Sequence, residues 1–231
     1  MDDRSKPSSP EDCLSHRLEK CENITAGHEL NLADLHLTTV PSQILNMSSL
    51  RVMNLRNNNL ASLPIEFVEC FPLLEVVNLA QNHLTHLPPD MGSLQKLRKL
   101  FAQSNQLRSL PLSLTGCTKL VELFVQHNRI QDIPDEFALL SSLQVLSIAH
   151  NELKTLPKGL HALVKLKVVD LSGNPDLTDV PENIRRLHDR HAVLHSKQMR
   201  RELISRALKV KRAVIQALQA QAREVAVNLS K

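Results

Sequence analysis

Histidine is the residue whose type and spacing in this 231-residue chain come closest to the chemistry of a site. His188, His191 and His195 would share one face of a helix, where imidazoles can bind a metal ion. No cysteine or carboxylate accompanies them in an arranged shell, so we do not expect a metal ion there. His127 and His150 occupy equivalent positions of a repeat, and adjacent exposed histidines are more often solvated than poised for acid–base catalysis.

The sequence contains no motif typical of catalysis or cofactor binding. It lacks a Ser-His-Asp order, a Gly-rich phosphate loop, a C-x-x-C pair and an H-E-x-x-H motif, and five glycines leave little room for a phosphate cradle. Four scattered cysteines predict reduced thiols rather than a disulfide framework; they are Cys13, Cys21, Cys70 and Cys117. We therefore expect no enzyme, no cofactor and no bound metal.

An asparagine recurs along the chain at spacings of 24, 23, 23, 23 and 23 residues. Around it the pattern L-x-x-L-x-L-x-x-N-x-L-x-x-L-P reappears, as from Leu143 to Pro157, and a degenerate first copy runs from Leu30 to Pro41. A fixed period of this length indicates a solenoid of about seven stacked repeats. The recurring asparagines are Asn58, Asn82, Asn105, Asn128, Asn151 and Asn174.

Each repeat predicts one short strand and one outer segment. Alternating apolar residues, such as Leu143, Leu146 and Ile148, indicate a strand with its apolar side inward. After each proline, apolar residues return every three positions, which suits a helical turn or a 3-10 segment. The predicted fold is therefore α/β, a curved right-handed horseshoe with a parallel sheet on its concave face.

The asparagines are predicted to do structural work. A buried side-chain amide at the bend after the strand can bond unpaired backbone groups of its own coil and of the next. Cys70 and Cys117 fall on the outer-face position that Leu94 and Leu140 occupy in other repeats, so we interpret both thiols as small core residues.

The repeats resemble the typical 23-residue leucine-rich repeats of intracellular proteins, in particular the Ras-group family that includes the Ras suppressor protein and the repeat domains of Erbin and Scribble. The most specific feature is the L-P junction, as at Leu63-Pro64 and Leu156-Pro157, and the resemblance covers residues 27 to about 190. It implies a scaffold or adaptor, often in signalling, that binds a protein through the concave sheet. The resemblance also implies a partner from a small GTPase, kinase or phosphatase assembly. The chain departs from the family where Leu35 replaces the first asparagine.

The concave face predicts a binding site at its middle. Phe is scarce in this chain, yet Phe101 and Phe124 take the outward position of adjacent strands, where water is expected. Strands about 4.8 Å apart would join the rings into one apolar patch, and an aromatic centre with a polar rim is typical of a protein interface. The remaining predicted contact residues are Lys99, Glu122, Gln103, Gln126, His127, Asn78 and Ser147.

The two ends predict caps for the solenoid. Residues 1–10 are expected to be a disordered tail, 11–26 an N-terminal capping helix, 27–195 the solenoid with its final outer helix, and 196–231 a basic amphipathic helix. Residues 182–231 carry twelve Lys or Arg against four acidic residues, while the rest of the chain has a net charge of −4. The last helix could cap the final coil, bind a partner or a second copy, or contact an anionic membrane, nucleic acid or a calmodulin-type protein.

From the sequence we expect a non-catalytic adaptor in the cytoplasm, with the nucleus left open, because no signal or transit segment and no membrane-length apolar run is evident. We expect a monomer that binds a protein, with a dimer as the alternative, and we do not expect nucleic acid as the partner. The competing hypothesis is a structural or assembly protein whose C-terminal helix drives oligomerisation or membrane-surface association.

Overall fold

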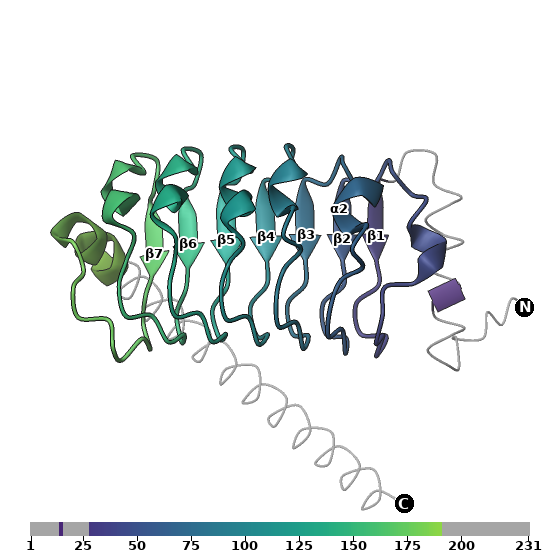
Figure 1. Cartoon of the computed structure of the whole chain (residues 1–231), viewed down its shortest axis with the longest axis horizontal. Coiled ribbons are helices and arrows are strands. Elements are labelled where there is room, and N and C mark those ends of the chain that lie inside the picture. Colours follow the sequence, from purple (N-terminus) through teal and green to yellow (C-terminus); the bar gives the residue numbers. More distant parts are fainter. Residues whose placement is uncertain (1–13, 16–27, 191–231) are drawn as a thin grey trace, which may run out of the picture. The chain divides into compact units, whose positions relative to one another are not determined.

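Seven short parallel strands form one sheet in a computed structural model that describes residues 14–15 and 28–190 (Figure 1). The sheet order is the sequence order, so each strand pairs only with its neighbours along the chain. The strands are β1 (Glu29–Asn31), β2 (Val52–Asn54), β3 (Val76–Asn78), β4 (Lys99–Phe101), β5 (Glu122–Phe124), β6 (Val145–Ser147) and β7 (Val168–Asp170). This confirms a curved leucine-rich-repeat solenoid of seven repeats; below, coil n is the repeat that contains strand βn.

The outer side of the solenoid is built from single helical turns. Five are 3-10 segments: η1 (Ser42–Ile44), η2 (Met91–Ser93), η3 (Leu112–Gly116), η4 (Asp135–Leu139) and η5 (Lys158–Ala162). Most follow a proline at or just before their first residue, whose fixed φ suits the start of a helical turn. The apolar residues spaced by three along these turns point back into the coil, as the sequence predicted.

Coil 2 differs because it is one residue longer, and its outer turn is the α-helix α2 (Phe67–Cys70). There the Cys70 N–H donates to the carbonyl four residues back, on Glu66, whereas the Cys117 N–H in coil 4 donates to Leu114, three residues back. The extra residue is thus absorbed by a wider turn. Phe71, which is fully buried, consequently takes the core position that the sequence analysis gave to Cys70.

That prediction is wrong for Cys70 and confirmed for Cys117. Cys70 is half-buried at the margin of the core, while Cys117 is fully buried and its thiol lies 3.2 Å from the Met91 carbonyl oxygen. Both thiols are free. Burial also raises the pKa of Cys117 to about 12, because a thiolate would lose its hydration there.

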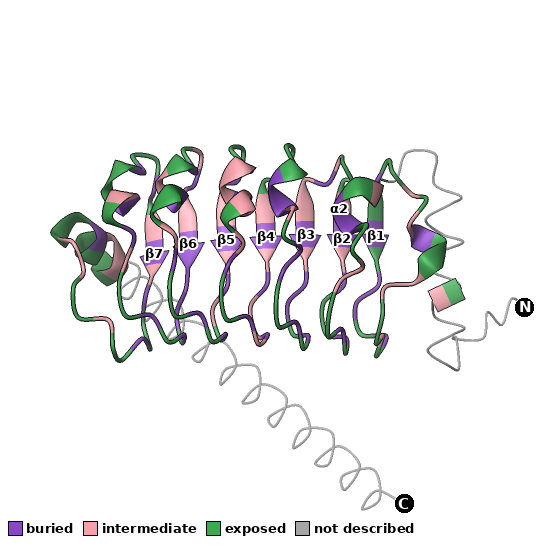
Figure 2. Cartoon of the chain, viewed as in Figure 1, coloured by how far each residue is buried: buried purple, intermediate pink, exposed green. Residues whose placement is uncertain are grey.

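The core is one continuous cluster of apolar side chains, mostly leucine, that runs through all seven coils. Figure 2 marks the buried residues along the backbone of each coil. In each strand the central residue is buried and the flanking residues are wholly or partly accessible, except in β6, where Ser147 is buried as well. Since side chains alternate across a strand, one face of the sheet packs on the core and the other lines the concave surface.

A ladder of six asparagines joins the coils, and all six side chains are buried. Asn128 is representative: its Nδ2 donates to the carbonyls of Val125 in its own coil and Ala102 in the preceding coil, each at 3.0 Å. Its Oδ1 accepts the N–H of Leu107, also in the preceding coil, at 2.9 Å. This confirms the structural role predicted for the asparagines and corrects its direction, because the amide reaches back rather than forward.

The backward direction explains why coil 1 has leucine at this position. Within the described residues no coil precedes β1, so an amide in place of Leu35 would have no backbone groups of an earlier coil to bond. Leu35 is instead buried, and its N–H donates to Asn58 Oδ1 at 3.1 Å. An apolar side chain therefore stabilises position 35 better than an asparagine would.

The terminal segments are described only in part. Leu14 is half-buried against the core, and residues 182–190 are helical, with Ile184 buried. The predicted tail 1–10, most of the predicted cap 11–26, the end of the outer helix and the basic helix 196–231 lie outside the described residues. The solenoid belongs to a compact unit that ends at His188.

Candidate protein-binding surface

The rings of Phe101 and Phe124 stack on the concave side of the sheet. Register pairs the two residues directly across β4 and β5, and their ring centroids are 5.1 Å apart with an interplanar angle of 6°. Both side chains are half-buried. The predicted aromatic patch is thus present, although each ring covers part of the other and neither is fully exposed. We call these two residues the Phe pair.

Two further sets of equivalent residues from coils 4 and 5 border the Phe pair. On one side, Lys99 Nζ lies 2.8 Å from Glu122 Oε1, an ion pair across the same two strands. On the other side stand Gln103 and Gln126, whose Oε1 atoms are covered and have no hydrogen-bond donor. Glutamine side chains can both donate and accept hydrogen bonds. The centre of the sheet therefore offers an apolar stack between a charged edge and a hydrogen-bonding edge.

The other predicted contact residues lie around this centre with different exposure. Asn78 is half-buried and accepts the N–H of Ala80 at 3.1 Å, which holds its side chain against its own strand. Ser147 pairs with Phe124 across β5 and β6 but is only 7% exposed, so it contributes little accessible surface. Sequence analysis missed Val76 and Val145, which are half-buried in register with Lys99 and Glu122 and extend the apolar area. Reading that strand position across all repeats would have found them.

His127 lies one coil from the equivalent His150, and their rings stack with centroids 4.4 Å apart. Both are exposed and have positive φ, 57° and 52°, at the bend before the asparagine. The ring of His150 also covers Gly173, where a Cβ would meet its Nδ1 at 2.4 Å. Face-to-face packing does not direct the ring nitrogens at one common point. This supports a packing role for the pair.

His188 is the described member of the three-histidine group, since His191 and His195 lie outside the described residues. Its Nδ1 accepts the N–H of Leu171 at 3.2 Å and is 4.0 Å from an oxygen of Asp170. Over residues 14–15 and 28–190, no group of three His, Cys, Asp or Glu side chains is placed to hold a metal ion. No helix in the same part of the chain is long and apolar enough to cross a membrane.

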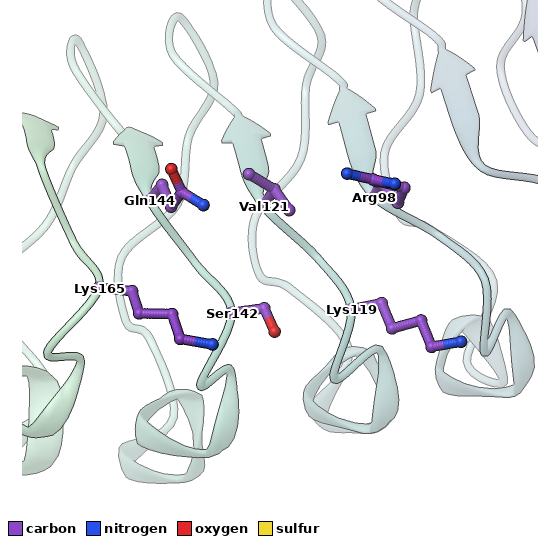
Figure 3. A pocket seen from close by; sticks show the side chains of 6 residues that line it. All are labelled: Arg98, Lys119, Val121, Ser142, Gln144 and Lys165. Carbon is purple, nitrogen blue, oxygen red and sulfur yellow. The ribbon is translucent and has the colours of Figure 1, made fainter.

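A second surface feature, a basic pocket, lies where the chain passes from the outer turns into the strands of coils 4 to 7 (Figure 3). It has a volume of about 270 Å³ and is lined by Arg98, Lys119, Val121, Ser142, Gln144 and Lys165. Sequence analysis did not identify it, because its residues are dispersed over almost 70 positions. The signal was a basic residue that recurs before the first leucine of a repeat, as at Lys119 and Lys165.

Comparison with known protein families supports the fold and the repeat pattern described above. A model of the leucine rich repeat matches residues 48–107, 72–130 and 118–175, which together exceed half of the chain. The chain therefore belongs to the leucine-rich-repeat family, whose fold is generally a non-enzymatic protein-binding one. No curated protein matches the sequence.

Several solved structures resemble the chain. A protein of Leptospira interrogans is 34% identical over 65% of this chain, with a TM-score of 0.59. The ectodomain of the Arabidopsis thaliana receptor kinase GASSHO1/SCHENGEN3, in complex with CASPARIAN STRIP INTEGRITY FACTOR 2, is 33% identical over 62%, with a TM-score of 0.58. The plant peptide hormone receptor RGFR1, in complex with RGF2, is 32% identical over 58%, with a TM-score of 0.54. The matched region spans 41%, 18% and 22% of these chains, respectively.

Proposed function

We propose that this chain is a non-catalytic scaffold or adaptor that docks a protein partner on its concave sheet, centred on the Phe pair. The observation that carries the proposal is the stack of two half-buried aromatic rings on the sheet face, 5.1 Å apart, in a chain with only five aromatic residues. Aromatic side chains at the centre of a surface, with polar groups at its edge, are typical of residues that dominate binding energy. The ion pair and the unsatisfied glutamine oxygens provide that polar edge.

The structural neighbours support a peptide or protein ligand for this type of surface. Two of them are receptors in complex with a partner. One complex contains CASPARIAN STRIP INTEGRITY FACTOR 2, and the other contains a peptide hormone receptor and RGF2. We extend this to the present chain as an intracellular adaptor in signalling, located in the cytoplasm. The free thiols of Cys70 and Cys117 support that compartment, because reduced cysteines are usual in the cytosol. A small GTPase, kinase or phosphatase assembly is the partner class that the Ras-group resemblance favours.

The proposal is tested by comparing partners captured from cells by the wild-type chain and by a variant with Phe101→Ser and Phe124→Ser. We expect the variant to lose specific partners by mass spectrometry while its circular dichroism spectrum is unchanged. A variant with Asn54→Ala, two coils away from Phe101 in the same column of the sheet, is the matched control. Capture that is equal for all three proteins would refute the assignment of the surface.

A further inference from the structure

The basic pocket differs in charge from the solenoid that carries it. Residues 1–181 have a net charge of −4, yet the pocket is lined by three cations and by no acidic residue. Arg98, Lys119 and Lys165 are exposed, and none of them forms an ion pair with another residue of the described ranges. The pocket is therefore a local positive site on an otherwise acidic body.

Neighbouring acidic residues are already neutralised elsewhere. Glu75 is paired with Arg51 at 2.6 Å, and Glu122 is paired with Lys99 at 2.8 Å. Glu75 directly precedes β3, and its carbonyl accepts the N–H of Arg98, while Glu122 is the first residue of β5. Both carboxylates are therefore near the pocket but already paired with other cations. Two further exposed lysines add positive charge: Lys96, three residues before β4, and Lys167, which directly precedes β7. Among residues 28–190, an anionic ligand would thus meet cations that no carboxylate already pairs.

The spacing of the cations favours an extended ligand. Lys119 lies before β5 and Lys165 lies at the same position before β7, so their backbones are two coils apart. Since neighbouring strands are roughly 4.8 Å apart, this separation is about 10 Å. An extended peptide covers about 10 Å in three residues. Figure 3 shows Lys119 and Lys165 projecting from separate coils, with Ser142 between them and Val121 and Gln144 above. The neutral floor offers a hydroxyl and an amide for backbone hydrogen bonds, and a single small anion would not span the two cations.

We propose that the basic pocket docks an extended acidic segment of a protein partner, with carboxylates about three residues apart that pair with Lys165 and with the Arg98 and Lys119 cluster. This site is separate from the Phe pair and does not require it. Since exposed ion pairs are individually weak, recognition depends on several pairs formed together. Affinity should consequently be modest for a short peptide and should decrease as salt increases.

The test uses the full chain and a fluorescein-labelled peptide, Gly-Glu-Ser-Ser-Glu-Gly, in a fluorescence anisotropy titration at low ionic strength. The same peptide with both glutamates changed to glutamine is the ligand control. We expect the glutamine peptide to bind at least about tenfold more weakly. Changing Arg98→Glu together with Lys119→Glu should weaken binding of the acidic peptide by at least about tenfold as well, equivalent to about 1.4 kcal/mol.

The protein control changes Arg108→Glu and Arg129→Glu, two exposed cations that belong to the same coils but lie beyond the strand ends. This control has the same net charge as the variant with Arg98→Glu and Lys119→Glu, and it should bind the acidic peptide with wild-type affinity. Equal loss in both charge-reversed variants would overturn the proposal, because it would show attraction by net charge alone. If the first variant is unfolded, Lys119→Gln with Lys165→Gln replaces it, and unchanged affinity there would overturn the proposal too.

Two further arms separate this site from other ligands and from the concave surface. Tighter binding of a single-stranded oligonucleotide or of phosphatidylserine vesicles through the same residues would overturn the proposal in favour of that ligand. The Phe101→Ser, Phe124→Ser protein should bind the acidic peptide normally. Loss of captured partners in the Phe pair variant therefore tests the concave surface alone. Loss of peptide binding in the pocket variants tests the basic pocket alone.

Discussion

The side-chain amide of Asn128 donates to the carbonyl oxygen of Ala102 at 3.0 Å and so ties coil 5 to coil 4. The same contact recurs for the other five asparagines with the backbone of the coil before each. No backbone hydrogen bond of the parallel sheet reaches these groups, because the chain turns away at the end of the strand. The stability of the stack should therefore depend on the ladder as well as on the leucine core.

Replacing Asn128 with leucine should destabilise the solenoid. The change leaves the N–H of Leu107 and the carbonyls of Ala102 and Val125 without the bonds that they make to this side chain. Each buried unsatisfied group costs about 1–3 kcal/mol, so we expect a loss of at least that size in urea denaturation. Gln131→Leu, an exposed amide in the next segment, is the control and should change stability by less than about 0.5 kcal/mol. An unchanged midpoint for the Asn128 variant would contradict the ladder.

Changing both members of the Phe pair to serine should cost little stability relative to its effect on binding. The rings are half-buried and stacked, and such a stack contributes about 0.5–1.5 kcal/mol beyond the area that it buries. We expect the free energy of unfolding to fall by about 1–2 kcal/mol, with partner affinity reduced about a thousandfold, because two aromatic anchors cost on the order of 2 kcal/mol each. Thermal melting and a titration with the captured partner measure the two effects. A decrease of more than about 4 kcal/mol in stability would show that the rings are core residues rather than a binding surface.

Gly92→Ala should loosen the contact between the outer turns of coils 3 and 4. A Cβ at Gly92 would lie 2.0 Å from the backbone oxygen of Ser113, which cannot move without shifting η3. We expect a loss of about 1–3 kcal/mol, as for overpacked core substitutions. Gly116→Ala on the opposing turn is the comparison, since its Cβ would approach Gly92 only to 3.1 Å and should cost less. Equal melting temperatures for the two variants would contradict this packing.

The buried thiol of Cys117 should resist alkylation until the chain unfolds. With its pKa raised to about 12, roughly one molecule in ten thousand carries the thiolate at pH 8. Half-buried Cys70 should react with iodoacetamide in the native protein, and peptide mass spectrometry separates the two sites. Because the folded-state pKa lies above the ordinary 9.0, the neutral thiol stabilises the fold below pH 9. That contribution should be lost as the pH rises from 9 towards 12, since the unfolded chain ionises first. Modification of native Cys117 as fast as Cys70 would show that its surroundings open readily.

The repeat spacing predicted the fold because one residue type, asparagine, must occupy the same buried bend in every coil after the first. It also placed the Phe pair correctly, since parallel register puts equivalent positions side by side. The position of Cys70 was predicted wrongly because the spacing of 24 residues shows that coil 2 has one extra residue but not where it lies. The α-helical turn α2 absorbs that residue just before Phe71. The burial of Ser147 was not predictable from register either, since it depends on the size of the neighbours around it.

The basic pocket escaped the sequence analysis for a related reason. Three of its six lining residues directly precede a strand, and the other three lie three residues before one. No contiguous segment is therefore strongly basic. Such a site emerges only when each position is compared down the stack of coils. In a periodic sequence the fold can therefore be recognised from a single repeat. A surface site is recognised only when equivalent positions of several repeats are compared.

The direction of the asparagine contacts also matches the direction in which a ribosome makes the chain. Every amide bonds the coil that was synthesised before its own, so its backbone partners already exist when the asparagine emerges. Because N-terminal segments fold first during synthesis, each finished coil can serve as the template on which the following one closes. No coil has to wait for a later part of the chain to complete its own rung, and growth of the nascent solenoid can proceed in step with translation.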